Sequence, residues 1–302
     1  MRLNGAGGRE LPICHRLNSA RPLGVEKKSW QLLASHKMVF NLGFIGGGNM
    51  STAIVQGILK QDSHPPSKIW VSGPHLENLK HWNDMETNVT NKNLEVFTNC
   101  DLVFLGVKPA LLSQAIDQCL GNTLKHLNKS ITVVSMLAGK LSSLASFKII
   151  RIMPNTPMTI GAGACLYTPD VNVSHLECQQ LEALLSTSSI CEKVPEAMMD
   201  TLGVLTACGP AFMYMVIEAL ADGAVKQGVP RAMAQRFAAQ MVVGSGQMVL
   251  QTGKHPGLLK DEVCSPGGST ICGVTALENG KLRATLINAI EAATVKTKGM
   301  SG

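Results

Sequence analysis

Short apolar runs alternate with helical periodicity along the first two thirds of the chain. The runs are rich in Val, Ile, Leu and Phe, and each stops near a Gly, Ser or Pro. They cover residues 39–45, 69–72, 102–107, 131–135 and 149–153. Continuous apolar runs of this length indicate strands that are buried on both faces. Because helical patterns fill the intervals, for example at 50–61 and 111–120, the alternation predicts a parallel sheet with helices on both faces.

Beyond about residue 196 the strand signals disappear and helical periodicity takes over. We expect helices over residues 211–227, 231–251, 269–279 and 281–298. Pro230 is expected at the first helical position of the second of these, where its missing N–H costs the helix nothing. The many Met and Ala positions suggest that this half buries itself partly against a partner chain. The expected fold class is α/β, a Rossmann-type doubly wound, mostly parallel sheet followed by an all-helical dimerisation domain.

Composition narrows the class of protein. The 302-residue length suits about two domains of roughly 150 residues each. Hydrophobic residues at 45% and charged residues at 16% exclude a disordered chain. An aromatic content of 4% is too low for base-stacking surfaces, and the net charge of +6 is mild, so no nucleic-acid partner is expected. The apolar runs fall short of the ~18–20 residues that cross a bilayer, so no membrane span is expected either.

Cysteine usage and the first residues bear on the compartment. The nine cysteines include no C-x-x-C pair, so we expect no metal site and reduced thiols in a cytoplasmic protein. Residues 1–37 are rich in Arg and Lys and carry only Glu10 and Glu26 as acids. This segment is either a mitochondrial transit peptide or an unstructured extension without a targeting signal.

A glycine-rich stretch joins the first predicted strand to the first predicted helix. Residues 46–51 read G-G-G-N-M-S, which fits G-x-G-x-x-small in the strand-to-helix context that gives this motif its meaning. Gly46 permits the tight turn, Gly48 lets the backbone approach a pyrophosphate, and Ser51 allows close packing of helix on strand. The helix N-terminus adds N–H donors and partial positive charge. The expected dinucleotide contacts are Ile45, Gly46, Gly47, Gly48, Asn49 and Met50.

The end of the second predicted strand distinguishes the two dinucleotides. NAD enzymes usually place an Asp or Glu there, whereas this chain reads Ser72-Gly73-Pro74-His75. No carboxylate repels a 2′-phosphate, so we expect NADPH as cofactor, with Ser72 in contact. NADH remains allowed, because no arginine clamp is present.

Further loops follow predicted strands at the same edge of the sheet, beyond which ligands lie in such folds. From these loops we assign to the cofactor Val107, Lys108, Pro109, Ala138 and Asn155. Lys108 is either a cofactor or substrate contact or a solvated lysine. Asn155 stands between two prolines, which suits a nicotinamide pocket and equally suits a plain rigid turn.

The stretch V-C-S-P-G-G-S-T at 263–270 precedes a predicted helix and offers a place for a small anion. Its two glycines let a small ligand approach backbone N–H groups, and the positive helix end suits a carboxylate. Ser269 or Thr270 is expected to cap the helix. The alternative is a capped loop that binds nothing.

Together these stretches resemble the pyrroline-5-carboxylate reductase family, which catalyses the last step of proline synthesis. The resemblance runs from about Met38 to Lys298. It is carried by F-I-G-G-G-N-M at 44–50, V-K-P at 107–109, R-I-M-P-N-T-P at 151–157, C-G-P-A at 208–211, A-D-G at 221–223, H-P-G at 255–257 and S-P-G-G-S-T at 265–270.

The resemblance implies NAD(P)H-dependent reduction of L-1-pyrroline-5-carboxylate to L-proline. It implies that the N–H groups of Gly268, Ser269 and Thr270 hold the substrate carboxylate. It also implies a catalytic Thr270 hydroxyl near the ring nitrogen, and a substrate contact from Glu196. A cyclic imine is readily protonated to an iminium that accepts hydride, so positioning does most of the work. Homodimers with interlocked helical domains, often assembled into decamers, are implied as well.

The expected organisation is an unstructured extension at 1–37, a dinucleotide-binding Rossmann domain at 38–196, and a helical substrate-binding and dimerisation domain at 197–302. The activity then depends on two electropositive helix N-termini that lie face to face. One would bind the nucleotide's diphosphate and the other the acid group of a small ring.

Three positions depart from the family's usual pattern. Gly203 replaces a common threonine, Cys208 lies in L-T-A-C-G-P where L-S-G-S-G-P is usual, and Gly253 stands where many relatives have an acid. These departures concern turnover and assembly more than fold. Two alternatives follow, a dinucleotide-binding relative that has lost catalysis and a related hydroxy-acid dehydrogenase. The latter relies on a helical lysine, and Lys226, the one lysine within 211–251, is expected near a helix end.

Overall fold

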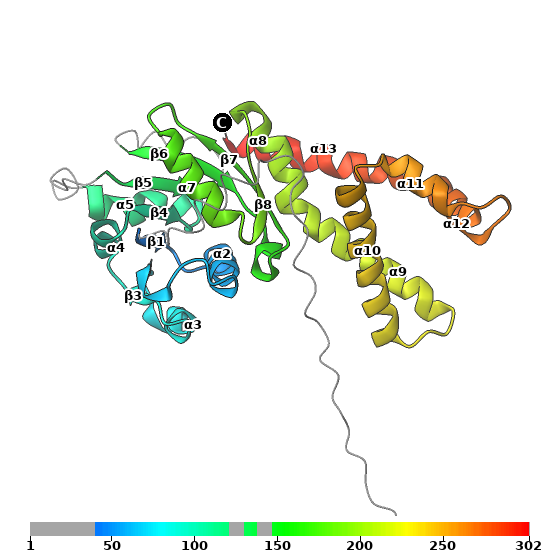
Figure 1. The fold of residues 1–302 in the computed structure, drawn as a ribbon, viewed down its shortest axis with the longest axis horizontal. Helices are drawn as coiled ribbons and strands as arrows, with labels where there is room; N and C mark the ends of the chain where they lie inside the picture. The colour runs from blue at the N-terminus through cyan, green and yellow to red at the C-terminus, as the bar shows by residue number, and fades with distance from the viewer. Residues whose placement is uncertain (1–39, 121–129, 138–146, 302) are drawn as a thin grey trace, which may run out of the picture.

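The computed structural model describes residues 40–120, 130–137 and 147–301. Eight strands form one sheet in the order β3-β2-β1-β4-β5-β6-β7-β8 (Figure 1). The strands are β1 (Leu42–Ile45), β2 (Ile69–Ser72), β3 (Asn88–Thr90), β4 (Leu102–Leu105), β5 (Thr132–Ser135), β6 (Lys148–Met153), β7 (Gly163–Pro169) and β8 (Ser189–Lys193).

The sheet is doubly wound about its central strand. From β1 the chain moves outward to β2 and β3, then crosses back to add β4, β5 and β6 on the other side. Pairings from β3 through β6 are parallel, β7 runs antiparallel to β6, and β8 runs parallel to β7. This confirms the predicted Rossmann-type, mostly parallel sheet. Its topological switch, between β1 and β4, is where ligands bind in such sheets.

Two separate apolar cores cover the two faces of the sheet. Along β4, Leu102 and Phe104 belong to one core and Val103 and Leu105 to the other, as strand alternation requires. The first core is closed by α2 (Asn49–Lys60), α3 (Lys80–Asp84) and α7 (His175–Leu185). The second is closed by α4 (Asn93–Asn99) and α5 (Leu112–Leu120). Short 3-10 turns join these elements, at η1 (Pro66–Lys68), η2 (Leu76–Leu79), η3 (Pro109–Leu111) and η5 (Thr156–Ile160).

The chain leaves the sheet as one long helix. Its parts are α8 (Glu196–Gly203), the π-helical η6 (Val204–Cys208) and α9 (Gly209–Lys226). The remaining helices are α10 (Arg231–Thr252), α11 (Pro256–Val263), α12 (Ser269–Asn279) and α13 (Leu282–Ser301). α10 packs on α9, and α13 returns to pack against α8 and η6. The other helices extend away from the sheet (Figure 1).

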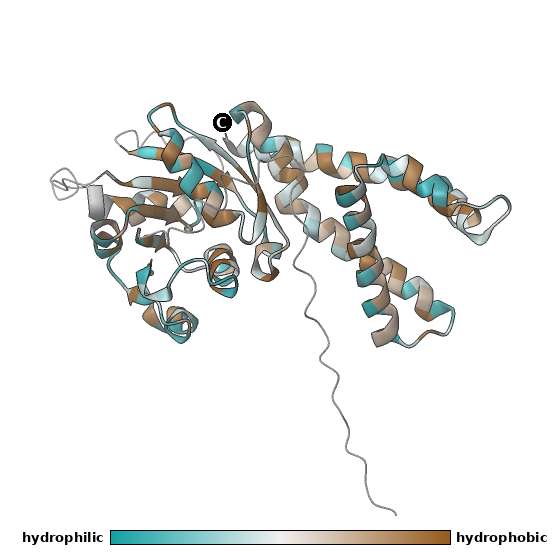
Figure 2. Ribbon diagram, viewed as in Figure 1, coloured by the Kyte–Doolittle hydropathy of each residue, from teal (hydrophilic) through white to brown (hydrophobic). Residues whose placement is uncertain are grey.

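The helical half leaves most of its apolar side chains in solvent. On α9 and α10 the fully buried positions are Ala221 and Ala234. The exposed large side chains of the same two helices are Met213, Tyr214, Met215, Leu220, Met233, Phe237, Met241, Val243, Met248 and Leu250. Figure 2 shows hydrophobic stretches along these helices. Apolar surface on this scale marks an interface.

Among the described residues one helix, Glu196–Lys226, is long and apolar enough to cross a membrane by length and composition, with a hydropathy of 1.6. This corrects the expectation that no segment reaches that length. The uninterrupted apolar runs are short, but α8, η6 and α9 form a continuous helix that carries its few charged residues toward its two ends. The expected absence of a membrane partner stays a prediction.

Several boundaries and elements differ from the sequence expectations. β1 begins at Leu42 rather than residue 39, and β4 ends at Leu105 rather than 107. Pro230 is the N-cap of α10 and not its first helical residue, because its ψ of 135° is not helical. β3, β7 and β8 were not predicted, since their polar and small residues break the apolar run that marks a buried strand.

Candidate active site

The carboxyl ends of neighbouring strands align in one row. Ile45 is in register with Ser72 and Leu105, Leu105 with Ser135, and Ser135 with Arg151. The loops that follow β1 and β4 therefore leave the sheet side by side at its topological switch. Ligands of doubly wound sheets bind beyond this edge, so this row is the floor of the candidate site.

The first half of the glycine loop is fixed by contacts inside the protein. Gly46 has a φ of 98°, and a Cβ there would lie 2.9 Å from the Gly106 carbonyl oxygen. Ser51 Oγ donates to the Gly46 carbonyl at 2.7 Å, and Trp82 Nε1 donates to the Gly47 carbonyl at 3.2 Å. Gly106 and Trp82 were not recognised in the sequence, because each meets the loop from a distant segment.

The second half of the loop faces open space. No heavy atom lies within 4 Å of a Cβ built on Gly48, whereas one built on Gly47 would lie 2.4 Å from Leu79 Cδ2. Gly48 is the N-cap of α2, which has no side-chain cap and no acid in its first turn. The first-turn N–H groups, at Asn49 and Met50, have no acceptor within the helix. An anion such as a diphosphate fits this space.

Ser72 lies inside the fold instead of lining the cofactor groove. Its side chain is fully buried, and its hydroxyl donates to Asn93 Oδ1 at 2.7 Å. Its carbonyl accepts the Gly46 N–H at 2.9 Å. In this chain Ser72 therefore supports the glycine loop, and its assignment to the cofactor stays a prediction. The exposed His75, 3.4 Å from Glu77, lies farther along the same loop.

The loop after β4 borders the glycine loop. A Cβ built on Gly46 would lie 3.1 Å from Val107 Cγ1, so the two loops are in contact. Lys108 and Pro109 are exposed just beyond this contact. Lys108 therefore stands at the cofactor edge with its side chain in solvent. Ala138 lies outside the described residues.

Asn155 uses both polar atoms of its side chain within the protein. Its Nδ2 donates to the Thr206 carbonyl at 3.1 Å, and its Oδ1 accepts the Ala164 N–H at 2.9 Å. The residue is 7% exposed. This geometry favours the rigid-turn interpretation, because both polar atoms of the amide already have partners within the protein. The assignment of Asn155 to the cofactor stays a prediction.

The sequence analysis missed an ion cluster around the buried Arg151, which precedes Asn155 by four residues. Arg151 is on β6, and its guanidinium pairs with Glu196 and, at 2.8 Å, with Asp200 Oδ1. Glu196 was expected to touch substrate, and its carboxylate is bound to this arginine. A charged residue inside an apolar strand was the available signal, because buried charges need partners.

In the glycine loop before α12, fewer backbone N–H groups are available to a ligand than the resemblance implied. The Gly268 N–H donates to the Ser265 carbonyl at 3.1 Å, so it is used within a turn. Gly268, with extended φ and ψ, is itself the N-cap, and no side-chain cap is formed. The expected caps Ser269 and Thr270 are corrected accordingly, because both are already helical. Their N–H groups remain first-turn donors for a carboxylate.

The two glycine loops do not meet within one chain. Figure 1 shows α12 at the far end of the helical half, well away from α2 and the sheet edge. α12 packs on α13, which runs back toward α8. The expectation of two helix N-termini face to face therefore fails for a single chain, because the helical half extends outward.

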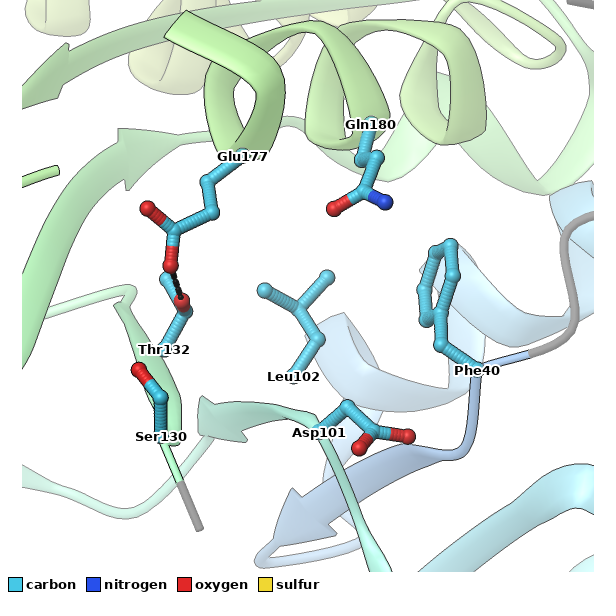
Figure 3. Close-up of a pocket in the computed structure, with 7 residues that line it drawn as sticks. All are labelled: Phe40, Asp101, Leu102, Ser130, Thr132, Glu177 and Gln180. Atoms are coloured by element: carbon cyan, nitrogen blue, oxygen red, sulfur yellow. Dashed lines mark hydrogen bonds between the residues drawn. The ribbon is translucent and has the colours of Figure 1, made fainter. Parts of the chain in front are cut away.

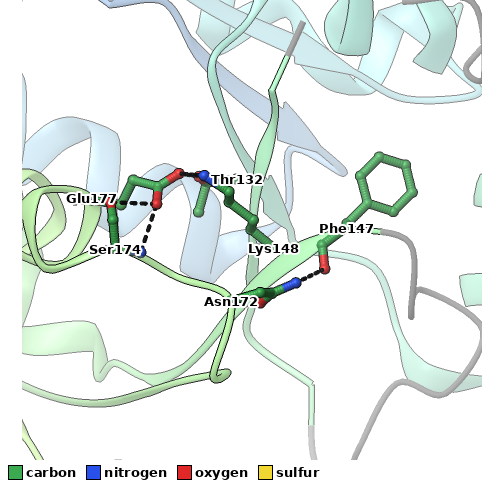
Figure 4. Close-up of polar contacts among 6 residues, drawn as sticks. All are labelled: Thr132, Phe147, Lys148, Asn172, Ser174 and Glu177. Carbon is green, nitrogen blue, oxygen red and sulfur yellow. Dashed lines mark hydrogen bonds and ion pairs between the residues drawn. The ribbon is translucent and has the colours of Figure 1, made fainter.

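A hollow of ≈ 260 Å³ lies at the opposite edge of the sheet (Figure 3). It is lined by Phe40, Asp101, Leu102, Ser130, Thr132, Glu177 and Gln180. Both acids that line it have partners. Asp101 Oδ2 accepts the Asn41 N–H at 2.8 Å, and Glu177 accepts hydrogen bonds from Ser174, from Thr132 Oγ1 at 2.8 Å and from Lys148 Nζ at 2.9 Å (Figure 4). Burial raises the pKa of Glu177, but these hydrogen bonds outweigh it and lower the pKa to about 2. Among the described residues this edge carries no glycine loop at a helix N-terminus, and ligands of doubly wound sheets bind at the opposite edge, so it is not the candidate site.

Two of the departures from the family pattern have local roles in the fold. Gly203 is buried, and a Cβ there would lie 3.0 Å from Met153 Cε. Gly253 is the C-cap of α10 with a φ of 64°, a conformation that glycine adopts without strain. Cys208, partly buried, precedes the first residue of α9. The glycines at 203 and 253 therefore fit their surroundings.

Two family models match successive parts of the chain. Residues 41–139 match the family described as NADP oxidoreductase, coenzyme F420-dependent. Residues 196–300 match the family described as pyrroline-5-carboxylate reductase dimerisation.

Curated proteins and solved structures agree with these matches. The chain is 40% identical to pyrroline-5-carboxylate reductase 3 of Danio rerio over 85% of this chain and 90% of that protein. It is 37% identical to pyrroline-5-carboxylate reductase of Arabidopsis thaliana over 87% of this chain and 96% of that protein. The crystal structure of the Plasmodium falciparum pyrroline carboxylate reductase with NADP bound is 29% identical and superposes with a TM-score of 0.78, covering 87% of this chain and 99% of that one. The chain belongs to the pyrroline-5-carboxylate reductase family.

Proposed function

We propose that the protein reduces L-1-pyrroline-5-carboxylate to L-proline with NADPH, the final step of proline biosynthesis. The observation that carries this function is the 40% identity to a curated reductase of that name over 85% of this chain, a span that includes both halves. The open glycine loop at the switch of the sheet supports it independently. The protein is therefore an NAD(P)-dependent oxidoreductase that acts on a cyclic imine.

The residues present fit the dinucleotide. The N–H groups at the start of α2 would hold the diphosphate in the space beside Gly48. The end of β2 presents no carboxylate against a 2′-phosphate, in agreement with the NADP bound to the Plasmodium relative. When bound, NADPH supplies the hydride.

Ser269 and Thr270 are the residues that we propose to bind the substrate. Their N–H groups lie in the first turn of α12 and would bind the ring carboxylate. Gly268, which has no side chain, would let the substrate approach the loop backbone closely. The Thr270 hydroxyl, near the ring nitrogen, would hold the proton there with the help of a water. Since the protonated imine already accepts hydride, correct placement supplies most of the rate.

Assembly completes the proposed site. Because α12 lies away from α2 in one chain, a second protomer has to present its Ser269 and Thr270 to this cofactor edge. The uncovered apolar residues of α9 and α10 support a homodimer through the helical halves. We extend this proposal to higher assemblies of dimers, up to a decamer.

A cytoplasmic location is part of the proposal. Six cysteines of the described part of the chain form no disulfide, namely Cys165, Cys178, Cys191, Cys208, Cys264 and Cys272. Free thiols in this number suit a reducing compartment.

Steady-state oxidation of NADPH by the purified full chain tests the function. We expect turnover with pyrroline-5-carboxylate and none with a panel of keto acids and open-chain imines. NADH should support the same reaction at a higher KM. Tight NADPH binding without turnover would instead identify a relative that has lost catalysis, and turnover of keto acids would identify a hydroxy-acid dehydrogenase.

A further inference from the structure

A buried arginine joins the cofactor edge of the sheet to the first helix of the helical half. The Arg151 side chain is 8% exposed; one terminal nitrogen donates to Glu196 Oε1 and the other to Asp200 Oδ1 at 2.8 Å. Glu196 and Asp200 are four residues apart, so they share one face of α8. A planar guanidinium that binds two carboxylates of one helix fixes both the position of the helix and its rotation.

A second polar link, from the loop that follows β6, contacts the next part of the long helix. Asn155 follows Arg151 by four residues and donates to the Thr206 carbonyl within η6 at 3.1 Å. Arg151 on β6 therefore fixes α8 to the sheet, and Asn155 in the loop after β6 fixes η6. Arg151 is also a member of the register row from which the cofactor loops emerge. The helical half is thus anchored at the floor of the candidate site.

Stability alone is a poor explanation for this cluster. Burying a charged group costs several kcal/mol, and apolar replacements of buried ion pairs are often neutral or stabilising. Arg151 adds to that cost, because its Nε is buried and has no hydrogen-bond partner in the described structure. What the cluster supplies better than apolar packing is a defined geometry.

We propose that Arg151 is a positioning residue for the reaction, acting through Glu196 and Asp200 to set the orientation of the long helix against the cofactor edge. The inference rests on the proposed function. Each helical half carries the α12 that another chain's cofactor edge requires, so the orientation of the helix decides where Thr270 meets the substrate. A misplacement of about 1 Å costs about 100-fold in rate. Glu196 then serves the reaction through this frame and without touching substrate.

The chain contains a matched control on the same strand. Lys148 begins β6 at the opposite edge and pairs with Glu177 at 2.9 Å (Figure 4). Both ion pairs join β6 to a helix. Lys148, however, lies at the edge without cofactor loops, so its loss removes an ion pair but leaves the orientation of the long helix unchanged.

The test compares Arg151→Lys, Glu196→Gln and Lys148→Ala in the full chain, with the wild type as reference. Lysine retains the charge but cannot bridge two carboxylates as a planar fork. We expect Arg151→Lys and Glu196→Gln to lower kcat/KM for pyrroline-5-carboxylate about 30-fold, mostly in kcat, with NADPH affinity within about twofold. Lys148→Ala should keep both quantities within about twofold.

Chemical rescue separates positioning from general destabilisation. In Arg151→Ala, guanidinium chloride at about 20 mM should restore turnover at least about fivefold by filling the vacated ion site, whereas equal sodium chloride should not. A denaturant would only worsen a merely unstable variant. The proposal is overturned if Arg151→Lys keeps wild-type kcat/KM, if Lys148→Ala loses as much, or if NADPH affinity falls in parallel. Absence of turnover in the wild type would reject the proposed function instead.

Discussion

The two halves of the molecule differ in how completely one chain can build them. The α/β half encloses two apolar cores, and its largest buried side chains include Trp82, Phe44 and Phe104. The helical half has long helices whose boundaries lie close to the predicted ones, but many of its large apolar side chains are exposed to solvent. Figure 2 shows the hydrophobic stretches along these helices. The difference shows that the α/β half is completed within one chain, whereas the helical half, which carries the proposed substrate loop, leaves apolar surface that a second chain would cover.

Blocking the open glycine should remove cofactor binding without unfolding the α/β half. We expect Gly48→Val to weaken NADPH binding about 1,000-fold, or about 4 kcal/mol, because the new side chain fills the space for the diphosphate. Its backbone is extended and a Cβ meets no atom within 4 Å, so the Tm should stay unchanged. Titration calorimetry and thermal melts measure both.

Gly47→Ala is the control for that change. Its Cβ would meet Leu79 at 2.4 Å and Trp82 at 2.7 Å, so it should lower the Tm of the α/β half. Unaltered NADPH affinity in Gly48→Val would mean that the loop does not hold the diphosphate.

A charge on the uncovered helices should break the assembly. Phe237 on α10 is 62% exposed in one chain, and Leu176 on α7 is 58% exposed. We expect Phe237→Asp to raise the dimer dissociation constant about 100-fold, or about 2.7 kcal/mol, because the proposed dimer would bury this ring and a charge there would be desolvated. Leu176→Asp should change it less than about twofold, because the α/β half is complete.

Analytical ultracentrifugation over a concentration series measures these constants. Equal behaviour of the two variants would contradict the distinction between the halves.

Removing the Thr270 hydroxyl should lower the rate of the reaction and leave cofactor binding by the α/β half unchanged. We expect Thr270→Ala to lower kcat about 30-fold with NADPH affinity and Tm unchanged, because the hydroxyl acts at the ring nitrogen. Thr275→Ala, five residues along α12, is the control, since that hydroxyl donates to the Ile271 carbonyl at 2.9 Å. If stopped-flow kinetics of Thr270→Ala match the wild type, Thr270 has no part in the mechanism.

The smallest expected effect is on the stability of the α/β half. It concerns Glu177, at the sheet edge opposite the cofactor loops, and the change in stability should not depend on protein concentration. The pKa of Glu177 is lowered from 4.5 to about 2 in the folded chain, so its ionised form stabilises the fold above pH 4.5. That contribution is lost as the pH falls from 4.5 to 2. Glu177→Gln should cost about 2 kcal/mol at pH 7 and progressively less below pH 4.5. Urea unfolding at several pH values checks this, and a cost that is constant with pH would contradict it.

The sequence predicted the parts of the fold that have a strong local period. The strands at β1, β2, β4, β5 and β6 are apolar runs, and α12 spans the predicted residues. β7 was missed because G-A-C-L-Y-T-P mixes small and polar residues, and its neighbour β8 because S-I-C-E-K has two charges. Their burial depends on packing between segments that sequence patterns do not reveal.

The candidate site was predictable in its loops but not in its side chains. The glycine loop could be assigned because strand, motif and helix are contiguous. Ser72 and Asn155 looked available, but each hydrogen-bonds a residue whose position follows from the tertiary fold. The Gly268 N–H is used in a local turn with Ser265. Arg151 was visible as a charge in an apolar strand. Its partners follow 45 and 49 residues later in the sequence, and only the folded chain identifies them.

The unbroken helix from Glu196 to Lys226 acts as a lever arm. Its 31 residues extend roughly 45 Å at 1.5 Å per residue, so a tilt of about 1° at the sheet moves the far tip by about 0.8 Å. Misalignments of that size are costly to hydride transfer. The mechanical tolerance at the Arg151 joint is therefore angular, on the order of one degree, and conservative exchanges in the packing around it should slow turnover while every reacting group stays chemically intact.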